Sequence, residues 1–467
     1  LVALDNQERI VGTRILTSED TPDHVDKLRD NAAFERGFKD WRPTSQPAPK
    51  LEGYAGSTLT ALAIEESIQK RLSGNYASLR FPTPLKLEEI KEIGFPEARG
   101  FEPNTPRLGW NLVRGPGDAA LGYVVRSSPS GDEVNGYAGH DLNGLTLEVA
   151  TVRALCQALL KVGVTSFLPT IITAPEARII AALRTIREAC AQYPEVAAMV
   201  AGIHVEGPHI APEDGPRGAH PAADVRAPSV AEFARWQEAA GGLVKLVTLS
   251  PHWPEAPAYI RHLVKSGVVV SLGHTSADAA QIAAAVDAGA SLSTHLGNGS
   301  HALLNRRHNH LWPQLADDRL TAMFIADGHH LTPAQLKVML RAKGLGRSLV
   351  VSDTVALGGL AAGKYHTPIG GKVELRADGY LAIDDGTGTY LAGAALPLLA
   401  ALPVLVDQVG LTFGEALALM TSAPGRVIGG GGVLAVGQPA DLVALEWDGG
   451  AAVPRVVGVW SRGVRSE

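Results

Sequence analysis

The feature that most constrains this chain is a series of short apolar segments, each ending in a histidine or a carboxylate. The segments occupy 201–206, 268–274, 291–295, 321–327 and 348–353. Runs of this length that are rich in Val and Ile suit strands buried on both faces, and the alanine-rich stretches between them suit helices. Alternating strands and helices imply a parallel sheet. We therefore expect an α/β fold built on a (β/α)8 TIM-like barrel.

Twelve of the fifteen histidines lie between positions 204 and 330. In such a barrel the C-terminal ends of the strands converge on one mouth, so polar residues that close different strands meet there. Histidine and carboxylate suit zinc, which in a catalytic site keeps three protein ligands and one open position. A single residue of this kind is more often an ordinary histidine or glutamate near a strand end. Because three follow in order, we predict Glu206, His274 and His295 as ligands of one divalent metal ion, with zinc as the first choice.

Seven short motifs stand in order along the same region. They are His204-Val-Glu-Gly-Pro-His-Ile210, Arg217-Gly-Ala-His-Pro221, Gly273-His-Thr-Ser276, Thr294-His-Leu-Gly-Asn298, Ala326-Asp-Gly-His-His330, Ser352-Asp-Thr354 and Leu391-Ala-Gly393. Together they resemble the signature of the N-acetylglucosamine-6-phosphate deacetylase family of the amidohydrolase superfamily. The resemblance covers about residues 133–465. It implies metal-dependent hydrolysis of the N-acetyl group of an amino sugar, first of all N-acetylglucosamine 6-phosphate, giving glucosamine 6-phosphate and acetate.

The resemblance also implies which residues perform the chemistry. Asp353 matches the catalytic aspartate of the family, and one carboxylate at the mouth can take a proton from water and give one to the leaving amine. His330 would contact the sugar and polarise the amide carbonyl as its oxygen becomes negative. Asp327 and His329 would support the site, because metal sites need partners around their ligands.

Recognition of the sugar is likewise inferred from the resemblance. His220 would contact the sugar, and Asn298 and Gly299 would hold the polar end of the substrate. The family commonly carries a His-His-Arg element whose arginine, supplied by a neighbouring subunit, binds the sugar phosphate. Here 305–310 is Asn-Arg-Arg-His-Asn-His, so Arg306 and Arg307 are the candidates. A homo-oligomer, most simply a dimer, is expected.

Glu133 and Asn135 stand where the first barrel strand is expected to end. Many amidohydrolases carry His-x-His at this point and bind two metals, whereas a subgroup of the deacetylases has Gln-x-Asn-Gly and holds one. The sequence Glu133-Val-Asn135-Gly resembles the second type. We expect one metal ion, although the carboxylate at position 133 leaves open a weak second metal site.

The chain is expected to divide into three parts: an N-terminal segment of unknown role (1–125), the barrel (126–425) and the C-terminal strands of a small β-sandwich-like domain (426–467). Deacetylases of this family usually begin with strands of the small domain, but the N-terminal segment reads as partly helical, with candidate helices at 21–30, 58–72 and 85–93. Further elements are predicted as helices at 146–162, 174–191, 229–240, 277–289 and 332–343 and as hairpins over 364–390.

Composition limits the partners and the compartment. With 19% charged residues and a net charge of −6, the chain has no general attraction for nucleic acid or for an anionic membrane. Two cysteines in 467 residues do not form a disulfide framework. No apolar run reaches the ~20 residues of a membrane span, and the first residues do not resemble a signal peptide. We expect a cytoplasmic protein whose partner is a small amino-sugar substrate.

Two other functions remain open from the sequence. One is an amidohydrolase that acts on a different N-acyl or cyclic amide substrate. The other is a non-catalytic barrel that binds a sugar phosphate as a sensor. Release of acetate from N-acetylated sugars, with and without phosphate, separates these functions from the first.

Overall fold

The structure is a computed structural model that describes residues 132–384, 391–427 and 439–466, with shorter stretches at 2–4, 10–13, 87, 91, 95, 97–103, 110–116 and 120–125. The chain forms two compact units, Leu1–Pro82 and Thr83–Glu467. The described part of the first unit is one antiparallel pair, β1 (Val2–Leu4) and β2 (Ile10–Thr13). The helices predicted at 21–30 and 58–72 lie outside the described residues, as does most of 85–93.

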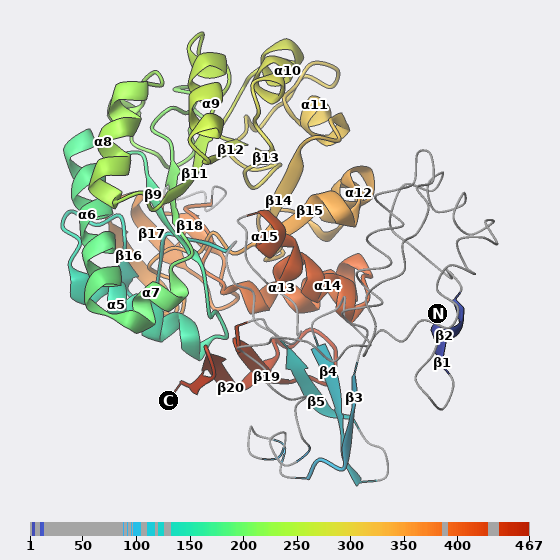
Figure 1. Cartoon of the computed structure of the whole chain (residues 1–467). Helices are drawn as coiled ribbons and strands as arrows, with labels where there is room; N and C mark the ends of the chain where they lie inside the picture. Colours follow the sequence, from blue (N-terminus) through green and yellow to red (C-terminus); the bar gives the residue numbers. More distant parts are fainter. Residues whose placement is uncertain are drawn as a thin grey trace. The chain divides into compact units, whose positions relative to one another are not determined.

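A barrel of eight parallel strands forms the centre of the second unit (Figure 1). The strands are neighbours in chain order: β6 (Glu133–Val134), β9 (Leu168–Ile172), β10 (Ile203–Glu206), β11 (Val244–Leu249), β12 (Val269–Leu272), β13 (Leu292–Ser293), β14 (Thr321–Ile325) and β15 (Ser348–Val351). The barrel closes where Val134 pairs with Thr354, just beyond β15. The predicted (β/α)8 barrel is thus confirmed.

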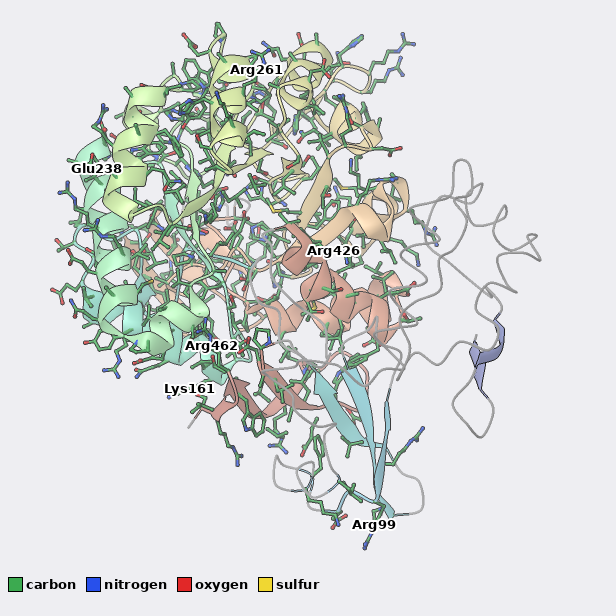
Figure 2. The ribbon with its side chains drawn as sticks, viewed as in Figure 1. Arg99, Lys161, Glu238, Arg261, Arg426 and Arg462 are labelled. Atoms are coloured by element: carbon green, nitrogen blue, oxygen red, sulfur yellow. The ribbon has the colours of Figure 1, made fainter. Side chains whose placement is uncertain are left out.

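Helices connect the strands and lie outside them (Figure 1). They are α5 (Val149–Lys161), α6 (Glu176–Gln192), α7 (Pro194–Met199), α8 (Val230–Ala240), α9 (Ala256–Lys265), α10 (Ala279–Asp287), α11 (Leu311–Ala316), α12 (Pro333–Lys343), α13 (Ala401–Pro403) continued by a π-helix (Val404–Val409), α14 (Phe413–Met420) and α15 (Ser422–Val427). All five barrel helices predicted from the sequence are present. Charged side chains such as Glu238 and Arg261 lie on their outer surface (Figure 2).

The starts of three helices follow from local sequence. α10, α12 and α14 each begin with a capping box, in which Asp278, Thr332 and Thr412 accept a hydrogen bond from the third helical residue. That third residue, a Gln or Glu, bonds back to the cap and satisfies a second free backbone donor. The helix boundaries around the barrel are therefore encoded locally.

The inside of the barrel is layered. An apolar layer includes Leu168, Leu246, Leu292, Met323 and Leu349. Because several of their strands are not neighbours, these side chains can meet only inside the barrel. Two residues further along β9, β11 and β13 the interior becomes polar, with Thr170, Thr248 and Thr294.

In this polar layer, His204 Nε2 bonds Thr248 Oγ1 (2.8 Å), which bonds Thr294 Oγ1 (2.7 Å). Thr294 Oγ1 in turn bonds Ser271 Oγ (2.6 Å). Such a network positions its members because an unpaired polar group buried there would be costly. It forms the floor beneath the strand ends.

A six-stranded antiparallel sheet joins segments from both ends of the second unit, in the order β21 (Val464–Arg465), β20 (Arg455–Ser461), β19 (Leu442–Glu446), β5 (Ala120–Val125), β4 (Trp110–Arg114) and β3 (Gly100–Pro103). Its middle is the pairing of β5 with β19 (Figure 1). No strands are predicted before residue 126, so this sheet differs from expectation. The three early strands are short, and β5 pairs on one side with β19, a strand more than 300 residues later.

A second, smaller sheet follows the last barrel strand. It is an antiparallel meander of β16 (Gly363–Thr367), β17 (Gly371–Leu375) and β18 (Leu381–Ile383). The predicted hairpins are confirmed as far as residue 384, and 385–390 lie outside the described residues. A further antiparallel pair, β7 (Gly136–Tyr137) and β8 (His140–Asp141), follows the first barrel strand. Both features lie after C-terminal ends of barrel strands, where they can shape the mouth.

We predict that Lys343→Met lowers the free energy of unfolding by about 2–3 kcal/mol. Lys343 is completely buried, and its Nζ donates to the backbone oxygens of Gln314 (2.8 Å) and Asp317 (2.6 Å) at the end of α11. Methionine keeps the apolar stem but leaves both carbonyls without this donor. Urea denaturation at pH 7 measures the effect. Lys265→Met, at an exposed lysine in the last turn of α9, is the control and should change stability by less than about 0.5 kcal/mol.

Candidate active site

The three predicted metal ligands meet at the C-terminal ends of the strands. Oε1 of Glu206 lies 3.2 Å from Nε2 of His274 and 3.0 Å from Nε2 of His295. The two Nε2 atoms are 3.0 Å apart. Ligands about 2.0–2.1 Å from one zinc ion lie ~3.4 Å from one another in a tetrahedron. The three donor atoms are therefore close to the spacing of ligands that share one ion.

The protonation of these groups also fits a cation. Nδ1 of His274 lies 2.8 Å from the carbonyl oxygen of Pro216, so it carries the proton and leaves a lone pair on Nε2. Burial opposes ionisation of Glu206, but the adjacent rings of His274 and His295 outweigh burial and hold its pKa well below the usual range. An ionised carboxylate facing imidazole lone pairs is a donor set suited to zinc.

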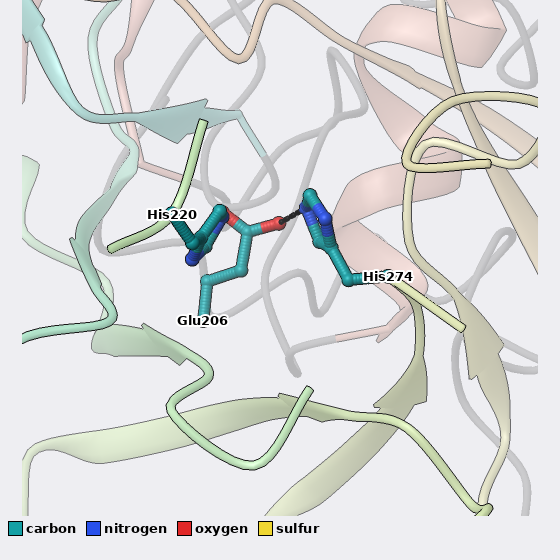
Figure 3. A group of neighbouring side chains, drawn as sticks. All are labelled: Glu206, His220 and His274. Carbon is teal, nitrogen blue, oxygen red and sulfur yellow. Dashed lines mark hydrogen bonds and ion pairs between the residues drawn. The ribbon is translucent and has the colours of Figure 1, made fainter. Parts of the chain in front are cut away.

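His220 extends this cluster. One donor atom of each of Glu206, His220 and His274 lies within 4.8 Å of the others, and Figure 3 shows the Glu206 carboxylate between the two rings. Nδ1 of His220 bonds Thr173 Oγ1 (2.8 Å), while burial lowers the pKa of His220 to about 3. The ring is neutral, so it can act as a metal ligand or as a hydrogen-bond partner of a substrate.

The backbone is strained at the strand ends of this site. His274, His295 and Asp353 have φ values of +48°, +26° and +50°, in a region that residues with side chains rarely adopt. Residues in this conformation persist where the surrounding structure holds them, and they gather at functional sites. Strand alternation points Ser271 and Thr294 into the barrel, so a regular strand would turn the two histidines the other way. The left-handed backbone returns them to the mouth.

Asp353 follows β15 on the interior side of the barrel. Its Oδ1 accepts a hydrogen bond from Nδ2 of Asn135 (2.7 Å). Burial and the neighbouring Glu206 carboxylate raise the pKa of Asp353 to about 8. A carboxyl group with a pKa near neutrality can both accept and return a proton.

His330 is paired with the carboxylate that precedes it in its motif. Nδ1 of His330 lies 2.7 Å from Oδ2 of Asp327, whose Oδ1 accepts the backbone N–H groups of His329 and His330. Burial raises the pKa of Asp327, but these bonds reverse the effect and lower it to about 2. The ionised carboxylate fixes the ring orientation of His330. The His329 side chain instead bonds the carbonyl oxygen of Asp378 through Nε2 (3.0 Å).

A cavity of about 730 Å³ contains most of the predicted site residues. Those that line it are Asn135, Glu206, His220, His274, His295, Asn298, Gly299, His330 and Asp353. Gly299 has φ +55°, and a Cβ there would lie 2.8 Å from Nδ1 of His274, so the loop can approach the ring only as glycine. An apolar wall from the β16–β18 meander, including Ile369 and Val373, also lines the cavity.

Other predicted residues do not line the cavity. Arg306 and Arg307 are exposed on the loop after Gly299, and the described lining of the cavity contains no Arg or Lys. Asp141 and Asn143 line the cavity although they were not predicted as site residues. Asn143 bonds the backbone of β9 at Thr170 (3.0 Å) and Ile172 (2.9 Å). Their position in the sequence could have indicated this, because both are polar residues that closely follow the first barrel strand.

Glu133 lies inside the barrel, away from the described lining of the cavity. It is completely buried, and its Oε1 lies 3.2 Å from Nδ1 of His204. Burial, and after it the Glu206 and Asp353 carboxylates, raises the pKa of Glu133 well above its usual range. These neighbours favour a protonated carboxyl group at this position.

Comparison with known proteins agrees with the fold and the cluster. The family model described as the amidohydrolase family matches residues 143–465. The chain therefore belongs to the amidohydrolases, which are metal-dependent hydrolases, and it is an enzyme that acts on carbon–nitrogen bonds. Within them it belongs to the N-acetylglucosamine-6-phosphate deacetylase family. The N-terminal region lies outside the match.

Individual relatives support this placement. The chain is 30% identical to the N-acetylglucosamine-6-phosphate deacetylase of Bacillus subtilis over 72% of this chain and 83% of the relative. It is 34% identical to the N-acetylgalactosamine-6-phosphate deacetylase of Escherichia coli O157:H7 over 67% and 81%, respectively. A solved mutant of the Mycobacterium smegmatis N-acetyl-D-glucosamine-6-phosphate deacetylase, in complex with N-acetyl-D-glucosamine-6-phosphate, is 26% identical with a TM-score of 0.65. The match covers 76% of this chain and 94% of that structure.

Proposed function

We propose that this enzyme removes the N-acetyl group of an amino sugar, with N-acetylglucosamine 6-phosphate as the first candidate, giving glucosamine 6-phosphate and acetate. The observation that carries this proposal is the cavity in which Glu206, His274 and His295 converge next to Asp353. Relatives with this activity match about two thirds or more of the chain. A single zinc ion is the proposed cofactor.

When bound by Glu206, His274 and His295, the ion would polarise the amide carbonyl and lower the pKa of a water molecule. The chain's own acid–base group is Asp353. It takes a proton from the attacking water as the C–O bond forms, and it returns that proton to the nitrogen as the C–N bond breaks. Asn135 holds the Asp353 carboxylate through the bond to Oδ1. Proton transfer during hydrolysis therefore needs no carboxyl group besides that of Asp353.

The remaining residues of the cavity bind and orient the substrate in this proposal. His330, fixed by Asp327, contacts the sugar and polarises the amide carbonyl as its oxygen becomes negative. His220 contacts the sugar, and Asn298 and Gly299 hold its polar end. The apolar wall excludes water from the opposite side. With these roles assigned, no Arg or Lys in the described lining of the cavity is left to bind the phosphate.

Arg306 and Arg307 are the proposed phosphate-binding residues, supplied across a homodimer. Arg306→Ala or Arg307→Ala should raise KM for a phosphorylated substrate by about 10- to 100-fold, the value of a charge-assisted contact. KM for the unphosphorylated sugar should change little. Steady-state kinetics with both substrates measures the difference, with Arg341→Ala, an exposed arginine of α12, as the control. Equal effects on the two substrates would show that neither arginine recognises phosphate.

The proposed activity is tested by acetate release from a small panel of compounds. The panel contains N-acetylglucosamine and N-acetylgalactosamine, each with and without the 6-phosphate, and one N-acyl amino acid. We expect acetate from a 6-phosphorylated sugar. Turnover of the amino acid alone would favour another amidohydrolase activity, and binding of sugar phosphate without turnover would favour a sensor.

We also propose a cytoplasmic location. In the described residues both cysteines, Cys156 and Cys190, are free thiols. No helix among these residues has the length and apolar character needed to span a membrane. The small phosphorylated substrate is a metabolite of the cell interior in this proposal.

A further inference from the structure

We propose that Asp132 is a positioning residue for Asp353, holding the strained backbone on which the proton-transferring carboxylate stands. This inference rests on the acid–base role proposed for Asp353. Asp132 does not line the described part of the cavity, and it lies outside the motifs named in the sequence.

The contact between Asp132 and the end of β15 is direct. Oδ1 of Asp132 accepts a hydrogen bond from the backbone N–H of Ser352 (2.6 Å), and Oδ2 accepts one from Ser352 Oγ (3.0 Å). Ser352 Oγ also accepts the backbone N–H of Thr354 (3.3 Å). One carboxylate thus holds the residue before Asp353 and, through the hydroxyl group, the residue after it.

The residues that directly follow β6 hold Asp353 and Thr354 through further hydrogen bonds. The backbone N–H groups of Asn135 and Gly136 donate to the carbonyl oxygen of Thr354 (2.9 and 3.1 Å), while the Asn135 side chain bonds the Asp353 carboxylate. Between these contacts Asp353 has φ +50°. A conformation of this kind costs about 1–3 kcal/mol and persists only when its surroundings fix it.

The chemistry of Asp132 indicates that its role is not limited to joining the first and last strands of the barrel. The residue is 1% exposed, and burial raises its pKa to about 7 even though Ser352 donates two hydrogen bonds to it. A buried ionisable group is costly, and the barrel closes elsewhere through ordinary backbone pairing between Val134 and Thr354. A bidentate acceptor is needed where a backbone N–H and a hydroxyl group must be held together, which is the arrangement at Ser352.

The first experiment compares Asp132→Ala with Asp132→Asn in the full chain loaded with zinc. Alanine removes both acceptors, and a misplaced acid–base group costs about 10- to 100-fold in rate. We expect kcat to fall by that factor while KM changes by less than about threefold and bound zinc is unchanged. Asparagine keeps an acceptor for the Ser352 N–H, so it should recover most of kcat.

The matched control is Asp441→Ala. Asp441 is also buried, and its Oδ1 accepts the backbone N–H of Arg462 (2.7 Å), but this contact lies in the six-stranded sheet. This variant should lose stability without losing kcat per folded molecule. If Asp132→Ala behaves in the same way, Asp132 is only structural and the inference is wrong.

Two further measurements keep the inference testable. Should Asp132→Ala not fold, Ser352→Ala removes only the hydroxyl link, and an unchanged kcat in that variant would overturn the inference. Should the wild type release no acetate from the panel, the proposed function fails, and crystal structures then decide about Asp132 separately. Those of the wild type and of Ser352→Ala are compared. An unchanged φ and carboxylate position of Asp353 in Ser352→Ala would overturn the inference, and a displaced Asp353 would support it.

Discussion

Asp353→Asn is expected to lower kcat by about 10²- to 10⁴-fold, the range typical of general acid–base catalysis. The amide has the size of the carboxylate, and its oxygen can still accept the hydrogen bond from Asn135 Nδ2. It cannot take a proton from water or give one to the leaving nitrogen. Single-turnover and steady-state assays of acetate release measure the loss.

The variant should retain its metal, because Asp353 is not one of the three converging ligands. Elemental analysis is therefore the accompanying control. Turnover by Asp353→Asn near the wild-type rate would exclude this carboxyl group as the base. The proposed ligand set would stand in that case, but proton transfer would have to be assigned to another group of the cavity.

Glu206→Gln is expected to reduce metal affinity by more than about 100-fold, since even the partners of ligands contribute 10- to 100-fold. Oε1 of Glu206 contacts both histidines, so a neutral amide removes the charge that joins the three donors. Wild-type protein should carry about one divalent ion per chain and the variant much less. Acetate release should fall in parallel and recover in part with excess zinc.

Glu133→Gln provides the matched control for this experiment. Glu133 is equally buried in the barrel but pairs with His204 outside the described lining of the cavity. We expect this variant to keep its single ion. Two tightly held ions in the wild type, with one lost in Glu133→Gln, would contradict the single-metal proposal and establish a second site at Glu133.

The outer architecture of the barrel was accessible from sequence because its signals are local. Hydrophobic runs of strand length, alanine-rich helices and capping residues such as Asp278 and Thr332 each act within a few positions. The small sheet was not accessible in this way. Of the strands β3–β5, the last pairs with β19, whose residues come more than 300 positions later, and no local period marks that pairing.

For the candidate site, too, some features follow from local sequence and others from the tertiary structure. The sequence by itself determined the residue types and their places at strand ends, and so the prediction that Glu206, His274, His295 and Asp353 gather at one mouth. Only the tertiary structure decided how they face one another, because strand alternation alone would turn both histidines away. Positive φ values direct His274 and His295 into the cavity, where Gly299 packs against His274, and hydrogen bonds fix the backbone around Asp353. Contacts between residues far apart in sequence set these angles, and a linear pattern carries no record of them.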